Sequence, residues 1–349
     1  MNAAGVEHKG GKWVTYLFKY GVPLIITAGL CYLLFRDIDY HEMLETIRRD
    51  CDFRYIGVAL GLSVFSHVFR GMRWGLQLRA LGIKPPLWVL VLSIFGTYAV
   101  NLVFPRLGEV WRTAWISQRQ RAPFSTVFGS MVADRLADTI TVLLLTVMTF
   151  VLASGEISRY LSQNTAMYHH VMDVASSPWL WCGVVAVVSL ICFGIYRFRH
   201  SAIVGKLHGF VKGLWGGFVV ILKMPHRLTW LLLTVALWGC YYLQLYVAFF
   251  AFPLTAEVVT QYGALAVLVC FVLSSISMGV PSNGGIGPWQ WSIIFGLSMY
   301  ASTIPGLDKE YATSFANLVM GCQTLLLILL GIITFAAVAI DRRHHADEK

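Results

Sequence analysis

Long runs of apolar residues, separated by short polar stretches, recur along the whole chain. A helix that crosses a bilayer needs about 20 consecutive residues that are mostly apolar. Of the 349 residues, 57% are hydrophobic and 13% are charged, whereas a soluble domain is about 25% charged. We therefore expect an all-α, polytopic integral membrane protein that forms one transmembrane domain over residues 1–349. The apolar runs cover residues 14–35, 55–78, 87–104, 124–153, 179–196, 228–252, 262–280, 288–300 and 312–340.

Two of these runs are followed by clusters of proline and glycine. The first cluster holds Pro105 and Gly108, and the second holds Pro281 and the Gly-Gly-Ile-Gly sequence at 284–287. Such clusters end helices, and irregular backbone is tolerated at membrane depth only inside protein or beside a wet cavity. We therefore predict two re-entrant hairpins, each a helix to mid-membrane, a turn, and a short helix back. Pro288 suits the first helical position after the second turn.

The order of spans and hairpins is the same in both halves of the chain. Span, span, hairpin, span occupies about residues 13–153 and again about residues 179–340. Each half crosses the membrane three times, so the halves would have opposite orientations, as in the inverted repeats of transporters. The sequence thus predicts about six full spans plus two re-entrant hairpins arranged as an inverted repeat.

Basic residues give the expected orientation. The loop 197–227 carries six of them, whereas the loop 154–178 carries one. The positive-inside rule places this basic loop and both termini in the cytoplasm, in the cell (cytoplasmic or inner) membrane. Apolar residues at helical spacing within 203–218 predict a surface helix there, and a plain connector is the alternative.

The net charge of +9 and the seven cysteines exclude several other classes. Lipid headgroups and membrane orientation explain the basic residues, so no nucleic-acid partner is expected. The cysteines are scattered and form no CxxC pair, so neither a disulfide framework nor a metal site is indicated. No cofactor is expected, and the oligomeric state, including a homo-oligomer, is left open.

Ionisable residues inside the apolar runs are unfavourable there and indicate function. Helical neighbours among them are Glu109 and Arg112 in the first hairpin, and Glu109 also suits a first helical turn because of the helix dipole. The fourth run places three charges within two turns, either as a self-neutralising ion pair or as part of a site. The charged and titratable residues in question are His67, Arg70, Arg73, Glu109, Arg112, Asp134, Arg135 and Asp138; Arg73, near a run's end, can also extend to the interface.

If both short helices begin near mid-membrane, their N-termini point at one central region. Helix N-termini bind phosphates and carboxylates, and the arginines make this region mildly positive. We expect Arg112 to border a wet cavity and Asp134 or Asp138 to be the partner of Arg112 and Arg135. The candidate substrate-binding residues are Arg70, Asn101, Pro105, Gly108, Glu109, Arg112, Asp134, Arg135, Asp138, Pro281, Asn283, Gly284, Gly285 and Gly287.

Four motifs occur in order along the chain: His67-x2-Arg70-x2-Arg73-Trp74, Asn101-x3-Pro105-x2-Gly108-Glu109-x2-Arg112, Asp134-Arg135-x2-Asp138 and Pro281-x2-Gly284-Gly285-Ile286-Gly287. Together they resemble the transmembrane region of lysylphosphatidylglycerol synthases, also found alone as a flippase-like domain, over about residues 20–340. Two features depart from that family: Gln290 stands near a position where the family usually has glutamate, and the final run has Asn317 and Gln323 but no arginine.

The resemblance implies a lipid flippase that moves a phospholipid, or an aminoacylated or glycosylated lipid, between leaflets. The soluble aminoacyltransferase domain is not in this chain, so the synthase activity is not expected. Two alternatives remain: an ion-coupled solute transporter, and a membrane-embedded enzyme acting on a lipid phosphate. The enzyme is disfavoured because a Mg²⁺-pyrophosphate site needs several carboxylates from different helices. The membrane-depth acids here are few, so we expect a transporter rather than an enzyme.

Overall fold

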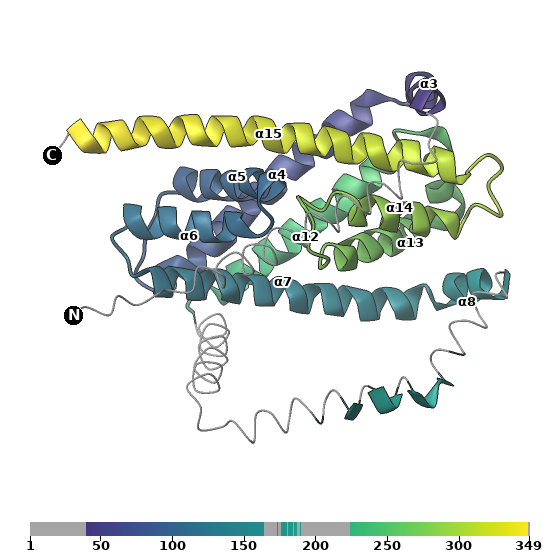
Figure 1. Ribbon diagram of the computed structural model, residues 1–349, viewed down its shortest axis with the longest axis horizontal. Helices are drawn as coiled ribbons and strands as arrows, with labels where there is room; N and C mark the ends of the chain where they lie inside the picture. Colours follow the sequence, from purple (N-terminus) through teal and green to yellow (C-terminus); the bar gives the residue numbers. More distant parts are fainter. Residues whose placement is uncertain are drawn as a thin grey trace, which may run out of the picture. The chain divides into compact units, whose positions relative to one another are not determined.

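The structure is a computed structural model of the full chain. It describes residues 40–163 and 224–347, together with a few positions between 173 and 189. All ten elements in the described ranges are helices (Figure 1). Their bounds are α3 Tyr40–Asp50, α4 Phe53–Ala80, α5 Leu87–Val103, α6 Leu107–Arg119, α7 Phe124–Leu152, α8 Ser154–Gln163, α12 Arg227–Phe249, α13 Pro253–Ser277, α14 Pro288–Ser298 and α15 Lys309–Asp347.

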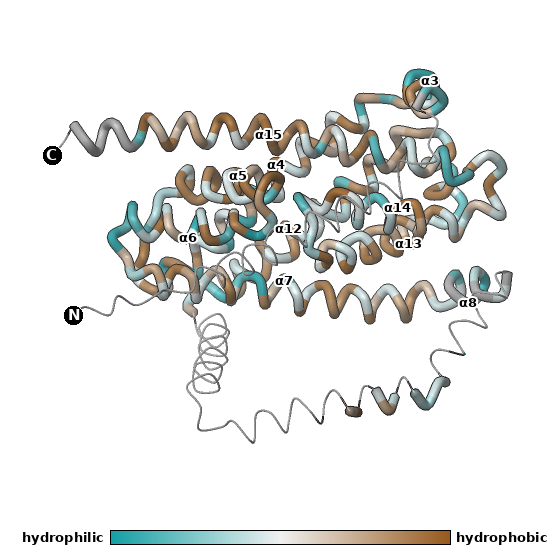
Figure 2. Tube along the Cα trace, in the orientation of Figure 1, coloured by the Kyte–Doolittle hydropathy of each residue, from teal (hydrophilic) through white to brown (hydrophobic). Residues whose placement is uncertain are grey.

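Five of these helices, α4, α7, α12, α13 and α15, are long and apolar enough to cross a membrane, and α5 is a shorter apolar helix. Figure 2 shows hydrophobic residues along most of α7 and α15. Many of their apolar side chains, such as Leu144 and Ile332, are exposed, as expected for helices solvated by lipid. The prediction of an all-α polytopic membrane protein is therefore confirmed. The predicted span 14–35, the surface helix at 203–218 and nearly all of the run 179–196 lie outside the described residues.

Capping side chains and prolines fix where the helices begin. Asp52 accepts a hydrogen bond from the Arg54 N–H at 2.9 Å, which starts α4. Asp308 does the same for the Tyr311 N–H at 2.8 Å and starts α15. α13 begins at Pro253, whose missing N–H is not needed in a first helical turn.

The helices fall into two compact units. The first contains α3 to α6, the first residues of α7, and α12 to α15, while the second contains α7 from Gly129 onward and α8. These units do not coincide with the two predicted halves of the chain. In the first unit, α15 packs against α3, α4, α5 and α14.

The two predicted helix breaks are present. α5 ends at Val103 and α6 begins at Leu107, while α13 ends at Ser277 and α14 begins with Pro288. The Arg119 guanidinium at the end of α6 lies 4.9 Å from the ring centroid of Trp88 at the start of α5. The two arms of the first hairpin are therefore antiparallel.

The second hairpin closes in the same way at its outer end. The rings of Tyr262 and Tyr300 lie 4.8 Å apart, so the later part of α13 and α14 are also antiparallel. Gly263, with φ +70°, interrupts the helical backbone next to Tyr262. α13 thus starts nine residues before the predicted run, because Pro253 opens a helix that continues to this break.

Candidate functional site

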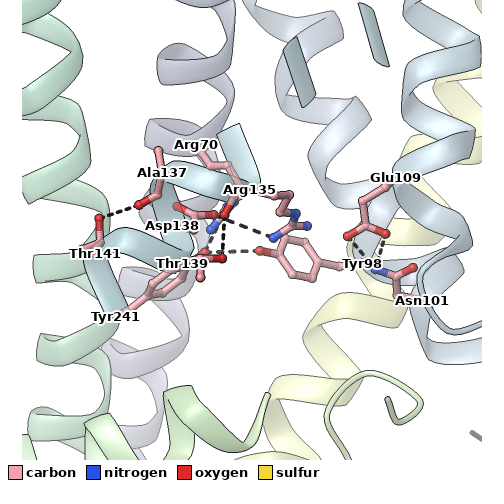
Figure 3. A network of polar contacts seen from close by, with 10 residues as sticks. All are labelled: Arg70, Tyr98, Asn101, Glu109, Arg135, Ala137, Asp138, Thr139, Thr141 and Tyr241. Carbon is pink, nitrogen blue, oxygen red and sulfur yellow. Dashed lines mark hydrogen bonds and ion pairs between the residues drawn. The ribbon is translucent and has the colours of Figure 1, made fainter. Parts of the chain in front are cut away.

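Asn101, near the end of α5, holds the start of α6. Its side-chain oxygen accepts a hydrogen bond from the Gly108 N–H at 2.8 Å, and its side-chain nitrogen donates to the two Glu109 oxygens at 3.4 and 3.3 Å (Figure 3). A Cβ atom at Gly108 would come within 2.7 Å of the Thr97 carbonyl carbon. α6 therefore begins pressed against α5, with Glu109 in its first turn, as predicted.

The turns of the two hairpins meet, although they are far apart in the sequence. The Gly284 N–H donates to the Asn101 carbonyl oxygen at 3.1 Å. The Asn283 side-chain nitrogen donates to the carbonyl oxygens of Leu102 at 3.3 Å and Val103 at 3.4 Å. The structure therefore brings together the two proline- and glycine-rich segments that the sequence singled out.

Arg106 adds a side-chain contact between the two turns. Its guanidinium donates to the Gly279 carbonyl oxygen at 2.9 Å. Arg106 has φ +62°, a left-handed conformation that is unfavourable for residues with a Cβ. Gly284, with φ +63°, occupies the same region without that penalty, and a Cβ there would lie 2.5 Å from a Leu102 methyl carbon. The backbone conformation at 284 thus favours glycine, and a larger residue there would also displace the Leu102 side chain.

Several N–H groups predicted to face an anion already have partners within the protein. Gly108 and Gly284 donate to Asn101, and Gly287 donates to the Gln290 side-chain oxygen at 2.7 Å. The Gln290 side-chain nitrogen in turn donates to Asn317 on α15 at 2.8 Å. At these three positions the helix dipoles, and not free N–H groups, would attract an anion.

Two arginines of the first unit lie buried over tryptophan rings. The Arg112 guanidinium carbon lies 4.5 Å from the ring centroid of Trp74, and that of Arg73 lies 5.5 Å from Trp230. Both arginines are fully buried. Arg73 therefore does not extend to the protein surface, and Arg112 is enclosed and not open to a wet cavity. Of the two possibilities that the sequence left open for Arg73, the structure has the buried one.

Arg70 belongs to a polar chain that links three helices. Its Nε donates to the Tyr241 hydroxyl at 3.3 Å, and the Tyr241 and Tyr98 hydroxyls lie 3.2 Å apart (Figure 3). Tyr98 and Tyr241 were not predicted as site residues. Tyr98 precedes Asn101 by three residues, so its place on the same face of α5 could have been found. Tyr241 gave no signal, because it is neutral and one of 15 tyrosines.

The charges of α7 lie in the second unit. Asp134 and Asp138 are buried, and Arg135 pairs with Asp138 at 3.9 Å as a neighbour three residues away on the helix. The predicted pairing of Arg135 with an acid of this motif is thus confirmed for Asp138. In the part of the chain that the structure describes, no group of three His, Cys, Asp or Glu side chains could hold a metal ion.

The other predicted residues lie at the two turns. Pro105 stands between α5 and α6, and Pro281 precedes the turn that contains Gly284. Gly285 and Gly287 have φ of +84° and +92°, values that favour glycine. Together with Asn101, Gly108, Glu109 and Asn283, these residues form what we call the hairpin junction, residues 101–109 and 279–287.

The family model of the lysylphosphatidylglycerol synthase transmembrane region matches residues 21–331. The chain belongs to this family. Both arms of each hairpin, the hairpin junction and the buried arginines all lie within the matched range. Membership therefore agrees with the multi-pass helical architecture.

One similar protein is named Glycosyltransferase AglD, from Haloferax volcanii. It is 30% identical over 120 residues, which cover 34% of this chain and 19% of that protein's length. This chain therefore matches only about a fifth of that relative. No solved structure matches the chain.

Proposed function

We propose that this protein is a lipid flippase that moves a phospholipid, or a lipid with an aminoacyl or glycosyl headgroup, between the leaflets of the cell membrane. The observation that carries the proposal is the burial of Arg70 and Arg73 on α4, a candidate membrane span, and of Arg112 on the hairpin helix α6. Charged residues at membrane depth are unfavourable and mark substrate pathways. Guanidinium groups bind phosphate well because several N–H donors match its oxygens. A lipid phosphate is therefore the favoured substrate group.

The surroundings of the hairpin junction favour a lipid over a soluble anion. Val103 and Phe104 on the first turn are 63% and 50% exposed, and Met278 and Val280 on the second are also exposed. Polar turns that hold Glu109 are thus flanked by apolar side chains. This combination suits a headgroup near the turns with acyl chains that remain in the bilayer.

The lengths of three of the four hairpin arms support the re-entrant topology. α5 has 17 residues, α6 has 13 and α14 has 11, and at about 1.5 Å per residue none of these three reaches the roughly 30 Å of a hydrocarbon core. The fourth arm, α13, has 25 residues, but its helical backbone is interrupted at Gly263. In our proposal the hairpins enter from opposite sides, and both termini are cytoplasmic. Arginines hold the phosphate, and Glu109 limits how tightly it is held, so that release remains fast. The chain acts as a transporter and not as an enzyme.

A translocation assay tests the proposal. The purified protein is reconstituted into vesicles that contain phosphatidylglycerol with a fluorescent acyl chain, and external dithionite then bleaches the accessible leaflet. We expect the wild type to make the inner-leaflet probe accessible. Arg112→Gln should slow this by about tenfold or more, since hydrogen bonds to charged groups contribute about 1.5–3 kcal/mol.

The matched control is Arg54→Gln, because Arg54 lies on α4 with an exposed side chain. This variant should translocate lipid at the wild-type rate. A wild-type protein that leaves the inner leaflet protected would refute the proposal. Equal rates for Arg112→Gln and wild type would remove Arg112 from the pathway.

A further inference from the structure

A cluster of hydroxyl and aromatic groups lies beside Arg70, and its members other than Arg70 have no role in the proposed function. It contains Arg70 and His67 from α4, Tyr98 from α5, and Tyr241 and Trp238 from α12. The Arg70–Tyr241 and Tyr241–Tyr98 contacts of 3.3 and 3.2 Å connect its polar atoms (Figure 3). Tyr98 and Tyr241 are only partly buried, so the cluster extends from the interior toward accessible space.

His67 is the most informative member of this cluster. It is 3% exposed, and its ring lies 4.5 Å from that of Tyr98 and 5.9 Å from that of Phe95. Within the described residues, neither of its ring nitrogens has a hydrogen-bond partner. Most buried polar atoms in native proteins are hydrogen-bonded, so a buried imidazole with two unused nitrogens needs an explanation.

Trp238 gives a second observation of the same kind. Its Nε1 is buried without a hydrogen-bond partner in the described part of the chain, and its ring lies 5.9 Å from that of Tyr241. The cluster therefore offers an N–H donor and an imidazole that both donates and accepts, next to two hydroxyls.

We propose that His67, Tyr98, Tyr241 and Trp238 form a recognition site for a polyhydroxylated lipid headgroup, a sugar or cyclic polyol joined through a phosphodiester. Hydroxyl groups donate and accept hydrogen bonds, and thus match an imidazole, two phenols and an indole N–H. The C–H face of a sugar-like ring packs against an aromatic ring such as Tyr98. This inference rests on the proposed function, since it names the substrate class of that pathway.

The position of Arg70 connects this site to the phosphate. Arg70 is one turn from His67 on α4, about 4.5 Å along the helix axis. Its guanidinium already contacts the Tyr241 hydroxyl. A phosphate bound to Arg70 would therefore place the alcohol esterified to it at the level of the Tyr98 and His67 rings. The recognition site thus selects the headgroup alcohol, whereas the arginines bind the phosphate, which all such lipids have.

Competition binding tests the inference with two lipids that differ only in the alcohol. Phosphatidylinositol and phosphatidylmethanol of identical acyl chains are added in equal amounts to the full-length protein in detergent. Native mass spectrometry then measures the ratio of the two complexes. We expect the wild type to bind phosphatidylinositol about tenfold better, the effect of one or two additional hydrogen bonds.

Two variants and one control assign the preference to the cluster. Tyr98→Phe removes a single oxygen atom, and His67→Phe keeps an aromatic ring but removes both nitrogens. Each should bring the ratio close to one and leave phosphatidylmethanol binding unchanged. Tyr246→Phe, on α12 but outside the cluster, should keep the wild-type ratio. Because Tyr98→Phe is so small a change, the test does not depend on the folding of His67→Phe.

The outcomes separate this inference from the proposed function. Equal binding of both lipids by the wild type, binding of neither, or an unchanged ratio in Tyr98→Phe would each overturn the recognition site. A clear preference without any lipid movement in the translocation assay would support the site and refute the flippase. Translocation of lipid without a binding preference between the two lipids would support the flippase and refute the recognition site.

Discussion

At the scale of single residues, Gly108 sets how closely α6 approaches α5. A methyl group there would overlap the Thr97 carbonyl, and backbone atoms cannot rotate away. We expect Gly108→Ala to destabilise the protein by about 1–3 kcal/mol, the usual effect of overpacking. The measurement is the thermal unfolding midpoint in detergent. Gly239→Ala is the control, because nothing lies within 4 Å of a Cβ at that position on α12, and an unfolding midpoint for Gly108→Ala as high as in this control would contradict the prediction.

The contact between Asn101 and Glu109 can be tested by moving the carboxylate from position 109 to position 101. Asn101→Asp keeps an acceptor for the Gly108 N–H but puts a carboxylate where the Asn101 side-chain nitrogen contacts Glu109. It should lower stability, because two carboxylates would face each other. Adding Glu109→Gln should restore at least half of the loss, since the new amide donates to Asp at 101. Stabilities that are simply additive in a double-mutant cycle would show that the two side chains do not interact.

At the residue level, the sequence located the two turns, because proline and glycine end helices. Pro105 and Gly284 lie at the helix breaks, and Arg112 is buried; their part in binding a substrate stays a prediction. Tyr98 and Tyr241 were missed, because a tyrosine in an apolar run is ordinarily a packing residue. For Arg73, burial and extension to the interface both stayed open, because the choice depends on Trp230, 157 positions further along the chain. Pairing across helices is not encoded in local spacing.

At the scale of helices, the breaks at both turns were predictable and two short helices were not. α5, α6 and α14 were found because proline and glycine end helices wherever they occur. α3 and α8 lie in stretches that were expected to be loops. Their apolar residues are few, although Met43 and Ile47 have the i, i+4 spacing of an amphipathic helix. α3 is stabilised by its packing against α15. Packing between helices far apart in the sequence cannot be predicted from a short polar stretch.

A prediction about the hairpin junction concerns Arg106. Its backbone is in the unfavourable left-handed conformation, and its side chain donates a hydrogen bond to the Gly279 carbonyl oxygen. Arg106→Ala loses the contact with the Gly279 carbonyl but keeps a left-handed residue with a Cβ. Arg106→Gly loses the same contact and relieves the strain, which is worth about 1–2 kcal/mol. The glycine variant should therefore be the more stable of the two by about that amount in thermal unfolding.

Amide hydrogen exchange is a second measurement on Arg106→Ala and Arg106→Gly. Loss of the Arg106 contact should speed exchange of the Gly284 N–H, which bonds the Asn101 carbonyl across the junction. Both variants should show this to a similar extent. Unchanged exchange at Gly284 would mean that the two turns are held together without Arg106.

At the scale of the whole molecule, the account requires that neither hairpin crosses the membrane. Single cysteines at Trp88 and Arg119 mark the outer ends of the first hairpin, and those at Tyr262 and Tyr300 mark the second. Each pair lies close together in the structure. We expect each pair to react with a membrane-impermeant maleimide from one side, and the two pairs from opposite sides. Labelling of one pair from both sides would refute the re-entrant hairpin that it marks.

In the proposed function, the buried arginines hold the phosphate of a membrane lipid. Electron cryomicroscopy of the protein in a phospholipid nanodisc tests it most directly. We predict density for a phosphate at the guanidinium groups of Arg70 or Arg112, continuous with acyl chains that leave between the exposed side chains of the hairpin junction. Lipid confined to the outer surface of the helices, with both arginines enclosed by protein in every conformation resolved, would contradict the account.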